Sequence, residues 1–160
     1  MKQLDELERF RDAYDLVKQG MRVSIVCALT GVTSHFVKRM WLDVYELPSK
    51  SGQLPASVTV FVKDPVMAAN LSGFVAYCLS KHSDLRYVLA ARPLIKTLNE
   101  YRWLSGTNTD ITAAYYAVRD MAARMVEWRY CTCCYAHYLY SPRSFQLRGC
   151  PFCRLVKKAA

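Results

Sequence analysis

The sequence lacks the features that mark most membrane, secreted and catalytic proteins. No apolar run in its 160 residues approaches the length of a membrane span, and the opening MKQLDELERFRD has no apolar core of a secretory signal. It contains no internal repeat, no glycine-rich phosphate loop, no Ser/His/Asp arrangement and no helix with paired carboxylates. We therefore expect a soluble, intracellular protein without a catalytic role.

Acidic side chains are missing from two segments, which hold nearly all the excess positive charge. Residues 16–42 carry four basic and no acidic side chains, and residues 128–160 carry six basic and none acidic, in a chain of net charge +9. A polyanion is the natural partner of such segments, because neutralised phosphates release counterions. The alternative is a solvated basic surface that keeps the protein soluble.

Five cysteines are concentrated in Cys131-Thr-Cys133-Cys134 and Cys150-Pro-Phe-Cys153. The C-x2-C-x15-C-x2-C spacing is typical of a zinc site, because each C-x-x-C turn directs two thiolates to one point. Cys131, Cys134, Cys150 and Cys153 are the predicted ligands of one structural Zn²⁺, since four thiolates leave no position open for substrate. Cys133 stays outside this set, because adjacent cysteines cannot easily bind one metal together.

Disulfides, a redox C-x-x-C and buried unreactive thiols are the competing interpretations. Disulfides need an oxidising compartment, which the missing signal segment disfavours. Cys150-Pro-Phe-Cys153 looks like the loop of glutaredoxin-type proteins, but we expect no βαβ unit in the seven residues after it. A zinc deaminase would carry H-x-E before P-C-x-x-C, and both halves are missing. His137 lies between the cysteine pairs and is a weaker candidate ligand.

The first basic segment predicts a helix-turn-helix hairpin after an amphipathic helix over residues 4–19. Residues 23–30 and 34–42 read as two helices around Gly31, which can adopt positive φ. The side chain of Thr33 should cap the second helix. Apolar side chains would join the helices at Val26, Cys27, Val32, Val37 and Met40. The opposite face would reach phosphates or base edges in the major groove through Thr33, Ser34, His35, Lys38 and Arg39. A simple core hairpin is the alternative.

The middle of the chain predicts a loop and three helices. PSKSGQLP at residues 48–55 is a loop, and the β-prone residues 58–62 follow. Asp64-Pro65 opens a helix to about Lys81, the next spans about 84–104 with a kink or break at Pro93, and the third runs from Thr109 or Asp110 to Trp128. Aromatic and methionine stripes on these helices predict core packing.

The last part of the chain predicts a zinc-ribbon layout. Residues 135–140 and 144–148 read as β-strands of a hairpin between the cysteine pairs, joined by residues 141–143. Tyr138 and Tyr140 would interleave on its surface with basic side chains that contact phosphates or a protein, namely Arg143, Arg148, Arg154, Lys157 and Lys158. The expected fold is mainly α: a helical domain over 1–127 with a helix-turn-helix-like segment at 23–42, then a zinc-ribbon-like four-cysteine module over 128–160.

The order of these motifs resembles the C subunit of the FlhD/FlhC master transcription activator. The shared features are Gly20 and Arg22 after the first helix, the Leu29-Thr30-Gly31-Val32 to Lys38-Arg39 hairpin, the Ser51-Gly52-Gln53-Leu54-Pro55 loop and the Cys-x-Cys-Cys…Cys-x-x-Cys end. The resemblance covers most of the chain, and the extra middle cysteine of the first pair is its specific mark.

This resemblance implies a DNA-binding transcription activator with one structural Zn²⁺ on Cys131, Cys134, Cys150 and Cys153. Its partners would be promoter DNA, a small helical FlhD-like subunit in a hetero-oligomer, and RNA polymerase, with no membrane. An end at Ala160 and a less Trp-rich segment at 58–62 fit a relative carried on conjugative plasmids or integrative elements, which switches on transfer genes instead of flagellar genes. A zinc-ribbon adaptor that binds protein or RNA without reading DNA sequence is the alternative.

Overall fold

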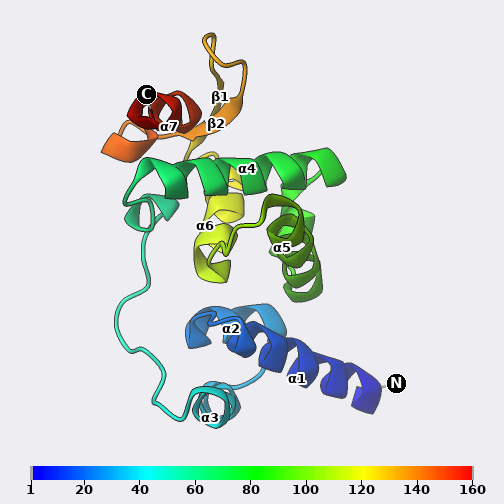
Figure 1. Cartoon of the computed structure of the whole chain (residues 1–160). Coiled ribbons are helices and arrows are strands. Elements are labelled where there is room, and N and C mark those ends of the chain that lie inside the picture. The colour runs from blue at the N-terminus through cyan, green and yellow to red at the C-terminus, as the bar shows by residue number, and fades with distance from the viewer. Residues whose placement is uncertain (1, 160) are drawn as a thin grey trace.

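The computed structural model describes residues 2–159, with side chains described for residues 3–157. Within that range the chain forms seven α-helices, three 3-10 helices and one two-stranded sheet, so the prediction of a mainly α fold is confirmed. None of the described helices combines the length and apolar character that crossing a bilayer requires. Three N-terminal helices form one end of the molecule, and the hairpin with the last helix forms the other (Figure 1).

The N-terminal layer consists of α1 (Lys2–Lys18), α2 (Val23–Thr30) and α3 (Ser34–Tyr45). Gly31 ends α2 at φ +70°, and its N–H donates to the Cys27 carbonyl, which confirms the predicted turn. Val26, Val32 and Val37 are buried between the helices, whereas Cys27 and Met40 are half-buried. The Tyr45 hydroxyl donates to the Val17 carbonyl at 2.9 Å and ties α3 to α1.

The predicted side-chain cap of Thr33 is wrong. Thr33 occupies the N-cap position of α3 with extended backbone, but its hydroxyl forms no hydrogen bond to the first turn. The first-turn amides of α3 are therefore left without a cap from this side chain. Helix α3 also runs three residues beyond the expected end at Leu42, and Glu46 closes it at φ +55°.

A long connection links this layer to the rest of the chain along one side of the molecule (Figure 1). Residues 48–55 are irregular, as predicted. The β-prone residues 58–62 form the 3-10 helix η1 (Val58–Val60) in place of extended chain. The reason is tertiary, since Val58 is fully buried and its N–H donates to the Asp120 carboxylate in α6 (Ile111–Ala122), so no strand ladder forms there.

The second layer contains α4 (Pro65–Lys81), η2 (Leu85–Leu89), α5 (Ala91–Ser105) and α6 (Ile111–Ala122). Asp64 and Asp110 cap α4 and α6, and each carboxylate accepts a backbone N–H at 2.8 Å. The expected helix over 84–104 is interrupted at Ala90, which places Pro93 in the first turn of α5, where no N–H is needed. Helix α6 stops before the expected Trp128, and Arg124 follows at φ +57°.

Helices α4 and α5 approach closely at Gly73. A Cβ at this position would lie 2.5 Å from the Tyr101 hydroxyl, which donates to the Asn70 carbonyl at 2.9 Å. Phe74 and Tyr116 are the largest fully buried side chains of the surrounding core. Phe74, Tyr101 and Tyr116 therefore pack in the core as the sequence predicted, whereas Trp103 and Met125 are exposed and do not.

The C-terminal part differs from the predicted ribbon. The strands are β1 (Glu127–Tyr130) and β2 (His137–Tyr140), paired antiparallel with Trp128 opposite Leu139. The predicted strand at 144–148 is instead η3 (Phe145–Leu147), followed by α7 (Pro151–Ala159). Residues 127–130 form the strand that pairs with β2. The side chain of Leu147 in η3 is fully buried and packs in the core. The hairpin therefore encloses the first cysteine pair.

This C-terminal part packs on α4. Leu139 and Leu147 belong to the same buried cluster as the helices, and the Leu139 N–H donates to the Ser72 hydroxyl of α4 at 3.1 Å. The position of the cysteine turns is thus set by contacts with the helical layer.

Candidate metal centre and nucleic-acid interface

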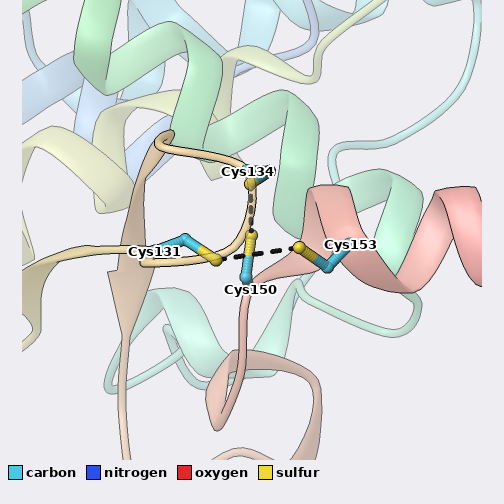
Figure 2. A group of neighbouring side chains, drawn as sticks. All are labelled: Cys131, Cys134, Cys150 and Cys153. Carbon is cyan, nitrogen blue, oxygen red and sulfur yellow. Dashed lines mark hydrogen bonds between the residues drawn. The ribbon is translucent and has the colours of Figure 1, made fainter.

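Two local structures present the four cysteines. Cys131 and Cys134 lie in the turn between β1 and β2, which is closed by bonds of 2.9 Å from Cys131 N–H to the Ala136 carbonyl and from Tyr135 N–H to the Cys131 carbonyl. Tyr135 adopts φ +60° in this turn. Cys150 directly precedes α7 and Cys153 lies in its first turn, so a turn and a helix start face each other (Figure 2).

The four sulfurs meet at one point. All lie within 4.8 Å of one another, with 3.7 Å between the sulfurs of Cys131 and Cys153 and 3.4 Å between those of Cys134 and Cys150. A tetrahedron with Zn–S bonds of about 2.3 Å has sulfurs about 3.8 Å apart. The cluster therefore has the donor type and dimensions for one metal ion, and the predicted grouping of these four cysteines is confirmed. Cys133 is exposed and lies outside the cluster.

Thiols of the cluster affect the ionisation of their neighbours. The backbone N–H groups of Cys134 and Cys133 lower the pKa of Cys131 to about 6. Hydrogen bonds with the Cys134 and Cys131 thiols raise the pKa of Cys153, and burial raises that of Cys150. One thiolate is thus readily formed, while further negative charge in the same small space is disfavoured. A bound dication would reverse this, because ligand thiols lose their protons on binding.

Neighbouring side chains fix the segment between the cysteine pairs. Arg154 of α7 donates to the Phe145 carbonyl at 3.1 Å and lies over the Phe145 ring, and Arg148 donates to the Pro142 carbonyl at 3.0 Å. His137, the weaker candidate ligand, lies in β2 and stacks on Trp128 at 5.9 Å. It is not part of the cysteine cluster.

The predicted basic face of α3 is open to solvent. Its exposed side chains are Thr33, Ser34, His35, Lys38 and Arg39. Two further basic residues, Arg22 and Lys50, line a pocket together with Ser34 and Lys38. Sequence reasoning missed these two residues. Arg22 belongs to the basic segment 16–42, but Lys50 lies in the loop and only the fold brings it near α3.

The basic residues of the C-terminal part are not equally accessible. Arg143, Arg148 and Lys157 are exposed, Arg154 is half-buried, and the side chain of Lys158 lies outside the described residues. Tyr138 is only 9% exposed, so its predicted place on the surface is wrong: β2 turns it inward. Tyr140 is half-buried, and the guanidinium of Arg129 lies over its ring at 3.3 Å.

The two basic areas are far apart. Helix α3 lies at one end of the molecule, while the hairpin and α7 lie at the other, beyond the layer of α4 and α6 (Figure 1). A single polyanion that touched both would have to run along the length of the molecule.

Comparison with known proteins gives the chain a family. Residues 2–160, essentially the whole sequence, match a protein family described as flagellar transcriptional activator (FlhC). No curated protein matches the chain at a significant level. The family match agrees with the resemblance carried by the hairpin, the loop and the cysteine pattern, and this family consists of transcription regulators. The chain therefore belongs to the FlhC family of flagellar transcriptional activators.

Proposed function

We propose that this chain is the DNA-binding subunit of a heteromeric bacterial transcription activator. It acts with an FlhD-like subunit and recruits RNA polymerase to its target promoters, which control flagellar or conjugative-transfer genes. The observation that carries the proposal is the exposed face of α3, where Lys38 and Arg39 point away from a hairpin whose other side is buried, in a chain of an activator family. Such an activator works in the cytoplasm, at the nucleoid.

Helix α3 would act as the recognition helix. Residues at the start and middle of such a helix face base edges in the major groove, and Ser34, Lys38 and Arg39 occupy those positions on the open face. An arginine can bind the two acceptors of a guanine in bidentate fashion, whereas hydroxyl groups are less selective. Arg39 is therefore the best candidate for sequence readout.

The cysteine cluster would hold one structural Zn²⁺ through Cys131, Cys134, Cys150 and Cys153. With four thiolate ligands the ion has no open coordination site, so its role is to stabilise the turn and the start of α7. We propose that the module over 128–160 makes a second DNA contact, separate from that of residues 1–127. Its exposed Arg143, Arg148 and Lys157 would bind phosphates. Because α3 and α7 lie at opposite ends, the promoter site would be bipartite.

The helical partner would cover apolar surface. Leu4 and Leu7 of α1 are 64% and 68% exposed, and Trp103 of α5 is 83% exposed. Large exposed aromatic and aliphatic side chains are typical of interaction sites. We therefore expect the chain to aggregate when it is expressed alone and to be rescued by co-expression with its FlhD-like subunit.

One observation favours the second candidate, a module that binds RNA or protein without reading DNA sequence. Tyr135 and Phe145 are each 70% exposed near the cysteine turns. Exposed aromatic rings beside basic residues are suited to stacking with unpaired bases.

Binding of the co-expressed complex to promoter and shuffled duplexes of equal length tests the proposal. A sequence-specific activator should prefer the promoter by about a thousandfold or more at physiological salt. Equal affinity for the two duplexes, with tighter binding to single-stranded RNA, would support the second candidate and contradict the first. The salt concentration must be held equal, because charge alone gives non-specific affinity.

A further inference from the structure

A pocket beside α3 has a basic and hydroxyl-rich lining. Its volume is about 500 Å³, and it forms where the start of α2, the start of α3 and the loop of residues 48–54 meet. The cationic side chains come from three segments of the chain, as Arg22, Lys38 and Lys50. Hydroxyl groups are supplied by Ser24, Ser34, Ser49 and Ser51. The described lining contains no acidic side chain.

The three cations have no ionic partner among the described residues. The ion pairs of the chain involve Arg86, Arg92, Arg119 and Arg129, and none involves Arg22, Lys38 or Lys50. Arg22 is half-buried and donates one bond of 3.3 Å to the Gln53 carbonyl, which holds its guanidinium against the loop. Like charges around one cavity repel each other unless an anion lies between them. The pocket is therefore electrostatically complementary to an anion.

The N-termini of helices α2 and α3 add to this positive potential. Val23 and Ser24 begin α2, Ser34 begins α3, and all three line the pocket. Neither N-cap residue, Arg22 or Thr33, uses its side chain to accept a first-turn N–H. Helix starts carry partial positive charge and free N–H donors. The cationic side chains supply most of the potential, and the helix ends strengthen it.

We propose that this pocket binds a phosphate group, and that the phosphate belongs to the DNA backbone beside the groove entered by α3. This rests on the proposed function of α3. Ser34 and Lys38 belong both to the pocket and to the exposed face of α3, so a phosphate held here lies next to the bases that α3 reaches. The pocket volume of about 500 Å³ leaves room for a phosphate group.

The pocket would set the position of α3 on the duplex. Contacts to phosphates fix the register of a recognition helix but carry no sequence information. Arg22 and Lys50 are thus positioning residues for DNA binding, whereas Arg39 lies outside the pocket and remains free to read bases. Loss of Arg22 or Lys50 should therefore weaken binding to every duplex alike.

The test compares salt dependence in the complex of the full chain with its FlhD-like subunit. The variants are Lys50→Gln and Arg22→Gln/Lys50→Gln, and the control is Lys81→Gln/Lys96→Gln, which removes two positive charges that do not line the pocket. Binding to promoter and shuffled duplexes is measured at several salt concentrations. Loss of one phosphate contact should make the negative slope of log K against log salt shallower by about one unit and weaken binding about fivefold at 0.15 M salt. The ratio of promoter to shuffled affinity should stay unchanged, and the control should keep the wild-type slope.

Thermal unfolding with inorganic phosphate separates the two possible sources of the ligand. Wild-type salt slopes in both pocket variants would overturn the DNA-backbone proposal, and phosphate stabilisation of the wild type alone would then identify a free-anion site. Shallower slopes in the variants, in a complex that fails to prefer the promoter, would support the pocket and contradict the proposed function of α3. If Arg22→Gln prevents folding, Lys50→Gln decides alone, because Lys50 is exposed on the loop.

Discussion

The carboxylate of Asp120 accepts the backbone N–H of Val58 at 2.6 Å, across 62 positions of the sequence. Asp120 is fully buried in α6 and pairs with Arg119 at 2.6 Å. Arg119 in turn donates to the Ala56 carbonyl at 2.8 Å. This pair of neighbours therefore attaches the end of the long connection to the second helical layer.

Asp120→Asn should destabilise the fold by about 2–3 kcal/mol, because the bond to Val58 loses its charged acceptor and Arg119 loses its ionic partner. Urea unfolding of the co-expressed complex measures the change. The matched control is Asp84→Asn, which alters an exposed carboxylate paired with Arg86 and should have a smaller effect. Equal effects of the two variants would show that the Asp120 contact contributes little.

Serine at Cys131 or Cys150 should remove the metal and disorder the turn and α7, because a structural zinc site supplies folding free energy to a small segment. The zinc content measured by metal analysis should fall from about one Zn²⁺ per chain to near zero. Cys133→Ser is the control, since this cysteine is exposed and lies outside the cluster. This variant should keep its zinc. A wild-type chain that is reduced, folded and free of zinc would contradict the metal site.

Alkylation should distinguish three classes among the six cysteines other than Cys27. Burial raises the pKa of Cys78 to about 12, so at pH 8 only about one molecule in ten thousand carries the reactive thiolate, and Cys78 should stay unmodified while the protein is folded. Raising the pH towards 12 should increase the thiolate fraction. Cys133 should react first at about pH 8, and the four clustered cysteines only after a chelator is added. Peptide mass spectrometry after iodoacetamide treatment measures the order; early labelling of Cys131 in the zinc-loaded protein would count against coordination.

Gly73→Ala should destabilise the contact between α4 and α5, because the new Cβ would lie 2.5 Å from the Tyr101 hydroxyl. Overpacking of about 1–3 kcal/mol exceeds the gain of about 1 kcal/mol in helix propensity, so a net loss of about 1 kcal/mol is expected. In a Tyr101→Phe background the hydroxyl is gone, and the same change should become neutral or stabilising. Thermal unfolding of the four proteins in this cycle tests the point. An identical loss in both backgrounds would exclude the Tyr101 clash as the cause.

Arg39→Ala should cost about 1–3 kcal/mol in promoter binding and relax the preference at one base pair, if its guanidinium reads a guanine. Lys157→Ala should weaken promoter and shuffled duplexes equally, because a phosphate contact carries no sequence information. Competition binding with single-base promoter variants distinguishes the two. Unchanged preference in Arg39→Ala, with loss of preference in C-terminal variants, would assign base reading to the cysteine module.

Local features of this chain could be predicted because they depend on neighbours in sequence. The C-x-x-C turns bring each cysteine pair together through short-range backbone bonds, Asp64 and Asp110 cap helices that start at the next residue, and Gly31 takes the positive φ of its turn. The hairpin, the loop and the cysteine pattern also indicated the family, which the match over residues 2–160 confirms. The contacts that stabilise these turns and caps lie within a few residues of one another, so the sequence alone predicts them.

Tertiary structure decided the features that depend on distant partners. Residues 137–140 pair with 127–130 and not with 144–148, because Leu147 finds a buried place in the core. The N–H of Val58 donates to a carboxylate 62 residues away, so this segment does not form a strand. The path of the loop places Lys50 in the same pocket as Lys38. Because β propensity depends strongly on context, burial and hydrogen-bond partners elsewhere in the chain determine the conformation of these segments.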